Sequence, residues 1–340
     1  MKRILPLFLA LALLLTGCAA VSTTETTSQT VSQVDSPSSA LESAPESASS
    51  QLESVGEVSI TDSNGSQITL DTSAPRVVAA YGSFAEAWLL AGGELCGVTQ
   101  DALEQRDLGL PEDIAVVGTV KEPNAEEIIA LEPDLVLLAS DITAQAEIRD
   151  VLENAGLACA FFQVDTFADY AFMMEQLCAI TGREDLYEEN VTQVGQQIEE
   201  AQANAALAST RPNVLLIRAF STGIKAKTDD ELAGAILKDL GAHNIADDHP
   251  SMLEDLSLEE VIAADPDYIF VTTMGDEQKA LDYLNGLIQQ NPAWSELSAV
   301  KEDRYIVLPK DLFHYKPNNR WGESYQYLGE ILYPELFHEE

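Results

Sequence analysis

The chain has 340 residues, with 57 acidic side chains against 18 basic ones and a formal net charge of −39. This charge argues against a nucleic-acid partner, because phosphate binding requires a basic face. The length leaves room for two lobes rather than a single hydrophobic core.

The first 20 residues, MKRILPLFLALALLLTGCAA, have the pattern of a secretory signal. Lys2 and Arg3 precede an apolar run at 4–15, which is too short to span a bilayer comfortably and leads into small residues. The run ends in LTGC (15–18), which resembles the lipobox of bacterial lipoproteins. The resemblance implies a signal peptide of residues 1–17, cleavage before Cys18 and lipidation of its sulfur. The mature protein would then be anchored to the cell membrane, outside the cytoplasm; an ordinary signal peptide with a chance cysteine is the alternative.

Residues 18–56 follow as a predicted tether. From residue 21 this stretch consists mostly of Ser, Thr, Glu, Gln, Ala and Val, and it contains no aromatic residue, lysine or arginine. Such a composition cannot bury enough apolar surface to offset the entropy of ordering. We therefore expect a disordered segment that holds the folded part away from the membrane.

Residues 57–172 are predicted to form an N-terminal lobe. VSITDSNGSQITL (58–70) alternates polar and apolar residues around an Asn-Gly turn, which predicts a hairpin. RVVAAYGSFAEAWLLAGG (76–93) predicts a strand, a turn and a helix that ends at its two glycines. Further strands are expected at 95–99 and 157–164, and a helix at 143–154. Alternating strands and helices predict an α/β fold with parallel sheet.

Residues 173–208 are predicted to be a helical linker. The segment has one expected break at Thr181-Gly182 and then some 25 residues without proline. A long helix there could span the body of both lobes. A helical crossover is stiff, so we expect lobe closure to be small.

Residues 209–340 are predicted to repeat the plan of the first lobe. A strand is expected at 213–220, a helix, glycine and strand within 230–246, a helix at 277–289, a strand at 305–309 and a last helix from about Trp321. The clearest repeat joins EEIIALEPDLVLL (126–138) to EEVIAADPDYIFV (259–271). The similarity indicates two diverged copies of one unit.

Each copy of this repeated unit carries two adjacent glutamates at a predicted helix start. Asn124 with Glu127, and Ser257 with Glu260, have the spacing of a capping box, which gives the second glutamate of each pair a role in folding. Glu126 and Glu259 are not needed for the cap and are expected to point into solvent. Ordinary acids at a helix start remain the alternative reading of this pair.

The chain resembles the substrate-binding lipoproteins of ABC importers, in the class that carries iron complexes (siderophore or haem) and cobalamin. The resemblance covers about residues 57–335. It rests on the lipobox, RVVAAYGSFAEAWLLAG, VGTVKEPNAEEIIALEPDLVLLAS, LSLEEVIAADPDYIFV and NPAWSELSAVKEDRYIVLP. It implies two Rossmann-like lobes with mostly parallel sheets, joined by a long rigid backbone helix with a ligand cleft between them. It also implies a monomer that docks on the permease dimer through one exposed glutamate per lobe, Glu126 and Glu259.

Ligands in open α/β sheets bind beyond the carboxyl ends of the strands. The loops expected there concentrate basic and aromatic side chains in the second lobe, which suits an anionic ligand or a metal chelate. The alternative is that these bases are solvated and pair with the abundant acids. The predicted ligand-binding residues are Tyr81, Ser83, Arg218, Phe220, Lys225, Lys227, Met274, His314, Tyr315, Lys316, Arg320 and Trp321.

An iron complex, either a ferric siderophore or haem, is the expected ligand, and no cofactor other than the lipid is expected. Haem would need an axial ligand, which Tyr81, His314 or Tyr315 could supply. Cobalamin or an oxyanion such as molybdate in the same transport role, and a ligand-sensing surface lipoprotein, remain alternatives. Bare iron is disfavoured because no cluster of Tyr, His and carboxylates is visible.

Two further patterns bear on the class of protein. Cys96, Cys159 and Cys178 show no C-x-x-C spacing, so a zinc site is not expected, at most one disulfide can form, and buried thiols are favoured. The chain lacks a G-x-S-x-G elbow, an H-E-x-x-H motif, a P-loop and a G-x-G-x-x-G after a strand. We therefore expect a binding protein and not an enzyme.

Overall fold

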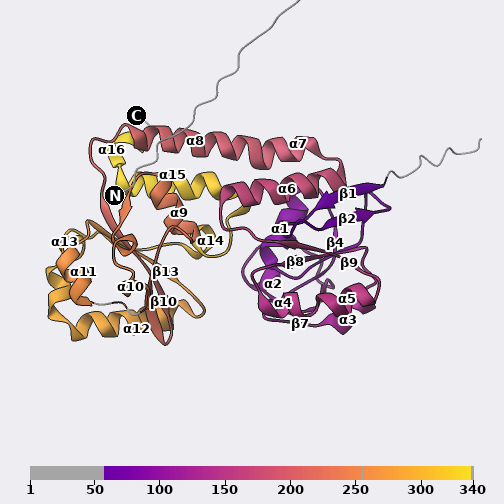
Figure 1. Ribbon diagram of the computed structural model, residues 1–340, viewed down its shortest axis with the longest axis horizontal. Helices are drawn as coiled ribbons and strands as arrows, with labels where there is room; N and C mark the ends of the chain where they lie inside the picture. The colour runs from indigo at the N-terminus through magenta and orange to yellow at the C-terminus, as the bar shows by residue number, and fades with distance from the viewer. Residues whose placement is uncertain (1–56, 255, 257, 338–340) are drawn as a thin grey trace, which may run out of the picture. The chain divides into compact units, whose positions relative to one another are not determined.

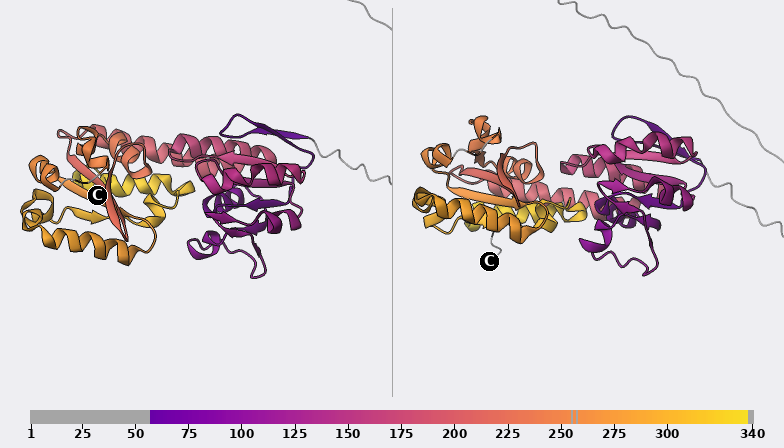
Figure 2. Two further views of the ribbon diagram at one scale, coloured as in Figure 1. Left: turned by 60° about the horizontal axis from the view of Figure 1, so that its bottom comes forward. Right: turned by 90° about the horizontal axis from the view of Figure 1, so that it is seen from below.

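The computed structural model describes residues 57–254, 256 and 258–337, which form a mixed α/β structure with two five-stranded sheets and two two-stranded ones (Figure 1). The predicted signal peptide, Cys18, the tether and Ser257 lie outside the described residues. The term first lobe is used below for the sheet that contains β3 and its helices, and second lobe for the sheet that contains β10 and its helices. Figure 2 shows these two groups from other sides.

The described chain begins with the predicted hairpin, β1 (Val58–Thr61) and β2 (Gln67–Leu70), which pair antiparallel. Asp62, although 2% exposed, accepts hydrogen bonds from the backbone N–H groups of Asn64 and Ser66 at 2.9 and 2.8 Å. Gly65 has a φ of +79°, which a glycine adopts without strain. The turn is therefore closed by one buried carboxylate together with the predicted Asn-Gly pair.

The sheet of the first lobe has the order β5-β4-β3-β8-β9, and all its neighbouring strands are parallel. Alternate residues of β3 and β8 enter two different apolar clusters, so helices cover both faces of the sheet. Its strands are β3 (Val77–Ala79), β4 (Leu95–Val98), β5 (Ala115–Val116), β8 (Leu135–Ala139) and β9 (Ala158–Phe162); β6 (Gly118–Thr119) and β7 (Glu122–Pro123) form a separate pair; the helices are α1 (Gly82–Leu90), α2 (Asp101–Glu104), α3 (Ala125–Ala130), α4 (Thr143–Glu147) and α5 (Arg149–Asn154).

The predicted linker is helical and has a break where the sequence indicated one. Helix α6 (Phe167–Thr181) begins with a capping box between Thr166 and Asp169 and ends at Gly182, whose φ is +67°. The chain is then helical through α7 (Glu184–Tyr187), a π-helical turn (Glu188–Thr192) and α8 (Gln193–Ala206). None of the described helices is both long enough and apolar enough to cross a membrane.

The sheet of the second lobe has the order β11-β10-β13-β14, with β12 also paired to β10; only β11 is antiparallel to its neighbour. Its strands are β10 (Asn213–Phe220), β11 (Gly223–Lys227), β12 (His243–Asn244), β13 (Tyr268–Thr273) and β14 (Tyr305–Val307); its helices are α9 (Leu232–Asp239), α10 (Ser251–Glu254), α11 (Leu258–Ala264), α12 (Glu277–Gln290), α13 (Ser298–Lys301), α14 (Lys310–Phe313), α15 (Trp321–Leu332) and α16 (Pro334–Phe337), with 3₁₀ turns at Ile245–Asp247, Pro292–Glu296 and Asn318–Arg320.

One apolar cluster joins the two lobes. It contains residues of β3 and β8 in the first lobe, of α6 and α8, and of β10, β13 and α15 in the second lobe. Figure 1 shows α8 and α15 lying side by side, and the two helices contact each other. The lobes are thus packed on shared helices, which agrees with a stiff connection.

The repeated unit has the same local structure in both lobes. In each copy a helix is followed by a left-handed residue before proline, Glu132 at φ +46° and Asp265 at φ +42°. The next aspartate then fixes the start of the neighbouring strand: Asp134 accepts from the N–H of Arg76 at 2.7 Å, and Asp267 accepts from that of Asn213 at 2.8 Å. The N–H of each aspartate donates back to the carbonyl of the same residue. The order of acid, proline and aspartate that recurs in the two copies is therefore explained by folding.

The predicted capping box is only half formed in the first copy. The side chain of Asn124 caps α3 by accepting from the N–H groups of Glu126 and Glu127 at 3.1 and 3.3 Å. The N–H of Asn124, which Glu127 was expected to bond, donates to the carbonyl of Val117 at 2.8 Å instead. In the second copy the carboxylate of Glu260 accepts from the hydroxyl of Ser251 at 2.9 Å.

Candidate functional site

Most of the predicted ligand-binding residues lie in three loop groups, each beyond the carboxyl end of parallel strands, where open α/β sheets bind ligands. The first group follows β3, the second lies at the ends of β10 and β13 and on β11, and the third follows α14, which comes after β14. The groups are Tyr81 and Ser83; Arg218, Phe220, Lys225, Lys227 and Met274; and His314, Tyr315 and Lys316.

The first group is built on the start of α1. The N–H of Gly82 donates to Asp101 at 2.7 Å, and a Cβ on Gly82 would lie only 2.8 Å from that carboxylate, so the turn requires glycine. Tyr81 packs its ring edge to face against Phe84, with centroids 5.3 Å apart. Burial raises the pKa of Tyr81. Ser83 is 2% exposed, so its hydroxyl is part of the packing and not a free ligand contact.

The second group contains basic side chains of β10 and β11, but an acid neutralises two of them. Arg218 lies directly opposite Lys225 on the antiparallel neighbour. Arg218 and Lys227 both pair with Glu231, whose side chain is half-buried. Lys225 is exposed and, among the described residues, has no carboxylate within ion-pair distance. Arg218 and Lys227 are therefore paired with a local acid, which was the alternative to a role in ligand binding. Lys225 keeps an unpaired charge.

Phe220 and Met274 lie beside each other at the ends of two neighbouring strands. The N–H of Met274 donates to the carbonyl of Ala219 at 2.9 Å, which extends the ladder between β10 and β13 by one bond. Both side chains are half-buried. They supply an apolar surface next to the cations of this group.

The surroundings of His314 strongly lower its pKa. Its pKa is lowered to about 4, chiefly by burial and then by the positive charges of Arg218, Lys310 and Lys316. The imidazole is therefore neutral at pH 7 and can accept a hydrogen bond or donate a lone pair. Its ring lies 5.2 Å from that of Tyr315.

Lys316 brings the three groups together across the two lobes. Its ammonium lies 3.0 Å from the carboxylate of Asp165, which belongs to the first lobe. Its charge opposes the effect of burial on the pKa of Tyr81, and it acts on His314 together with Arg218. Side chains from the turn after β3, from β10 and from the segment after α14 are thus within electrostatic reach of one another.

The structure places Arg320 and Trp321 elsewhere than predicted. Arg320 pairs with Asp311 and Glu323 at 2.8 and 2.7 Å, both in its own lobe. Trp321 is 1% exposed and lies in the shared apolar cluster, where its ring contacts that of Phe167 at 6.3 Å between centroids. The reason is that Trp321 is the first residue of α15, whose inner face packs against α8. In this structure Trp321 has no surface to offer a ligand.

Two basic residues near the site, Lys310 and Arg106, could not be predicted from the sequence. Lys310 donates to the carbonyl of Gly275 at 2.6 Å and lies 5.8 Å from the ring centre of Tyr315. Arg106 of the first lobe reaches the backbone of Tyr315 and Lys316. Neither belongs to a motif or a periodic pattern, and Arg106 lies 209 positions from its partner. Only the tertiary structure identifies them.

The described residues hold no group of three or more His, Cys, Asp or Glu side chains that could bind a metal ion. The three cysteines at 96, 159 and 178 are free thiols. Burial raises the pKa of Cys159 to about 12 and that of Cys178 to about 11, so both are protonated and unreactive at neutral pH.

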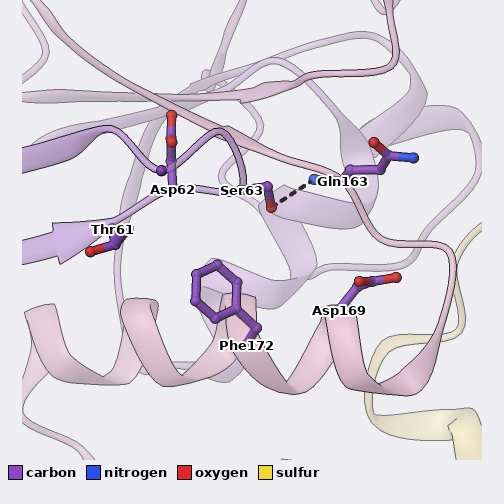
Figure 3. Close-up of a pocket in the computed structure, with 7 residues that line it drawn as sticks. Thr61, Asp62, Ser63, Gln163, Asp169 and Phe172 are labelled. Carbon is purple, nitrogen blue, oxygen red and sulfur yellow. Dashed lines mark hydrogen bonds between the residues drawn. The ribbon is translucent and has the colours of Figure 1, made fainter. Parts of the chain in front are cut away.

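A separate pocket of about 580 Å³ lies between the β1–β2 hairpin and α6 (Figure 3). Its polar groups are engaged in folding: Asp62 closes the hairpin, Asp169 completes the capping box of α6, and Ser63 accepts from the N–H of Gln163 at 3.2 Å. None of the predicted ligand-binding residues lines this pocket. Its contacts explain how the hairpin is attached and indicate no second ligand.

Glu126 and Glu259 occupy matching positions in the first turns of α3 and α11. Both side chains are exposed. Within the described part of the chain, neither carboxylate has a hydrogen-bond or ion-pair partner, whereas Glu260 is bonded to Ser251. The sequence-based prediction that an external partner docks on Glu126 and Glu259 requires one such unpaired carboxylate on each lobe.

Known proteins of similar sequence and fold are binding proteins. The chain is 26% identical over 273 residues to the Fe(3+)-citrate-binding protein YfmC of Bacillus subtilis, covering 77% of this chain and 82% of the relative. Its fold is similar to that of the TroA-like periplasmic binding protein FepB from Veillonella parvula (TM-score 0.66, 20% identity, 82% of this chain and 91% of that one). It is also similar to that of Staphylococcus aureus IsdE complexed with heme (TM-score 0.63, 19% identity, 76% and 99%).

These likenesses confirm the predicted two-lobed α/β fold. A family model described as periplasmic binding protein matches residues 77–312, which is more than half of the chain. The chain therefore belongs to the periplasmic binding protein family.

Proposed function

We propose that this protein is the extracytoplasmic solute-binding component of an ABC importer and that it captures an anionic iron chelate. The observation that carries this proposal is that Lys310 acts on the neutral His314 and contacts the ring of Tyr315, while the unpaired Lys225 lies opposite Arg218, which also acts on His314. Half-buried aromatic and apolar side chains lie at the same strand ends. Cations beside flat apolar surfaces suit a chelate that presents carboxylates around a metal centre. The Fe(3+)-citrate-binding relative supports this chemistry.

The charge of the site favours a chelate over a bare ion. A bare ferric or divalent ion needs several oxygen, nitrogen or sulfur ligands converging on one point. The described residues offer no such group, and Lys225 and Lys310 have no carboxylate within ion-pair distance among them. The metal would therefore arrive with its own ligands.

Haem is the second candidate, and the neutral imidazole of His314 favours it. A protonated histidine cannot bind iron, whereas the pKa of about 4 keeps the ring nitrogen lone pair free at neutral pH. Tyr81, from the other lobe, is the second side chain that could act as an axial ligand. Haem also carries two propionates, which the lysines could pair.

The test is titration of the purified protein with ferric citrate by calorimetry, and with haem by absorbance. For ferric citrate, Lys225→Gln should weaken binding by about tenfold, because one charge-assisted contact is lost. Lys301→Gln removes an exposed lysine that pairs with Glu296 in the same lobe, and it should leave binding unchanged. For haem, His314→Gln or Tyr81→Phe should shift the absorbance bands. Binding of cobalamin or molybdate, with neither iron ligand bound, would sink the iron-chelate assignment.

We further propose that the permease grips one exposed carboxylate on each lobe, Glu126 and Glu259, and that a lipid on Cys18 retains the protein at the membrane. The glutamates are supported by their matching places in the repeat and by their exposure. The lipid is supported by the LTGC sequence. Release of a Cys18→Ala variant into the medium is its expected signature.

A further inference from the structure

A segment of the second lobe is tied to the first lobe by side chains that are not among the predicted ligand-binding residues. We call residues 314–319 the strap; it runs from the end of α14 into the 3₁₀ turn before α15. The guanidinium of Arg106 donates to the carbonyl of Tyr315 and, at 3.0 Å, to that of Lys316. The amide of Asn318 donates to the carbonyl of Ser83 at 2.9 Å and to the carboxylate of Glu86 at 2.6 Å.

Glu86 is the centre of this arrangement. Its carboxylate pairs with Arg106 and also accepts from Asn318, so it holds the two donors that reach across the lobes. Only 10% of the Arg106 side chain and 24% of the Glu86 side chain are exposed. Hydrogen bonds between charged groups are stronger in such partly buried places, because solvent screens them little. We call Glu86, Arg106 and Asn318 the clasp.

The conformation of the strap shows why it needs the clasp. Lys316 and Asn318, on either side of Pro317, have φ values of +35° and +52°. Residues other than glycine rarely adopt this left-handed region and keep it only where surrounding contacts impose it. Asn318 is 1% exposed, so its amide cannot exchange its protein partners for water. Loss of the clasp would let the strap relax to ordinary dihedral angles.

The strap carries three of the side chains assigned to the ligand, His314, Tyr315 and Lys316. Arg106 donates hydrogen bonds to the strap carbonyl groups and also, at 3.1 Å, to the hydroxyl of Ser83. Ser83 belongs with Tyr81 to the first group of site residues. The clasp therefore fixes the distance between site residues of the two lobes. We propose that Arg106, oriented by Glu86, is a positioning residue that sets the strap for ligand capture; this inference rests on the proposed function.

The first part of the test uses the ligand-free full chain. Amide hydrogen exchange in Arg106→Gln should be at least tenfold faster than in the wild type for the strap amides, those of residues 314–316, 318 and 319. Arg183→Gln is the matched control, because Arg183 is an exposed arginine paired with Asp185 outside the site. Unchanged exchange in the strap of Arg106→Gln would overturn the clasp, whatever the ligand is.

The second part measures ferric citrate affinity by calorimetry, well below the unfolding temperature of each variant. Arg106→Gln should weaken binding by about tenfold, and Arg106→Lys by less, because the lysine keeps the charge but not the forked donors. A double variant with His314→Gln should lose less affinity than the product of the two single losses, since Arg106 acts through the strap. Lower stability with unchanged affinity would reduce Arg106 to a structural residue.

The two parts separate the two hypotheses. If wild-type protein binds neither ferric citrate nor haem, the proposed function fails, and the exchange measurement still decides whether the clasp orders the strap. If ligand binds but Arg106→Gln and His314→Gln act independently, the function stands and the positioning role is overturned.

Discussion

The basic side chains of the second lobe differ in whether a carboxylate lies within reach. Arg218 and Lys227 share Glu231, whereas Lys225 and Lys310 have no carboxylate partner among the described residues. A cation that is already paired contributes little to a ligand, since binding must first replace its partner. We therefore expect the two unpaired lysines to contribute most of the electrostatic attraction for an anionic ligand. His314, whose pKa is lowered in part by the charge of Lys310, adds a neutral polar side chain beside it.

The lowered pKa of His314 predicts a dependence of stability on pH. The pKa falls from 6.5 to about 4 on folding, so between these values the unfolded state binds a proton that the folded state does not. The wild type should therefore lose free energy of unfolding as the pH falls from about 6.5 to about 4, on the order of 3 kcal/mol through this group. Above pH 7 the contribution is constant.

Urea unfolding of the wild type and of His314→Gln at several pH values measures this effect. The variant lacks the histidine, so its stability relative to the wild type should improve steadily over the same range. Stability curves that stay parallel from pH 7 to pH 4 would show that His314 is not held neutral by the fold.

Among the helices and strands, the repeated unit shows how much local structure the sequence specifies. The proline, the aspartate that bonds the neighbouring strand and the Asn124 cap all act within one helix and one strand, so their positions were readable in advance. The helix expected at 143–154 is in fact two short helices that meet at Ile148. The half-formed capping box also differs from the pattern, because Val117 of a neighbouring segment competes for the cap N–H.

Glycines in helices provide a prediction at this scale. Gly182 ends α6 with a φ of +67°, whereas Gly286 lies inside α12, and a Cβ on either would meet no atom within 4 Å. Gly182→Ala should lower the free energy of unfolding by about 1 kcal/mol, because alanine is strained at positive φ. Gly286→Ala should raise it by up to about 1 kcal/mol, because alanine is the better helix former.

Each variant is the control for the other, because both substitutions add one methyl group where no other atom lies within 4 Å. Urea unfolding monitored by circular dichroism gives the two differences. A shift of the same sign in both variants would contradict the assigned backbone conformations.

For the whole molecule, the apolar cluster shared by both lobes and the helices α6, α8 and α15 limits how far the lobes can separate. A partner that binds one carboxylate on each lobe would therefore find Glu126 and Glu259 at a nearly fixed distance from each other. This spacing is useful to a permease only if ligand binding changes it little or in a defined way. The exposed positions of Glu126 and Glu259 suit such a partner.

Replacement of both glutamates tests this arrangement. Glu126→Ala with Glu259→Ala should leave ligand affinity unchanged and reduce uptake by at least tenfold, because the side chains lie outside the ligand groups. Uptake of labelled ferric citrate by cells that carry the cognate permease, together with calorimetry, gives both values. Glu188→Ala with Glu335→Ala, two exposed acids on other elements, is the matched control. Normal uptake by the Glu126/Glu259 double variant would rule out docking through these residues.

The sequence by itself determined the alternation of strands and helices, the break at Gly182 and the exposed glutamates of the repeat, because these depend on residues within a few positions of one another. Tertiary structure decided which cations are free, that Trp321 belongs to the core, and that Arg106 reaches the backbone of Tyr315 from 209 positions away. Pairing and burial depend on distance in space, and a partner far along the chain leaves no local pattern. The site residues could therefore be named from the strand ends, but their charges and contacts were set only when the two lobes packed on their shared helices.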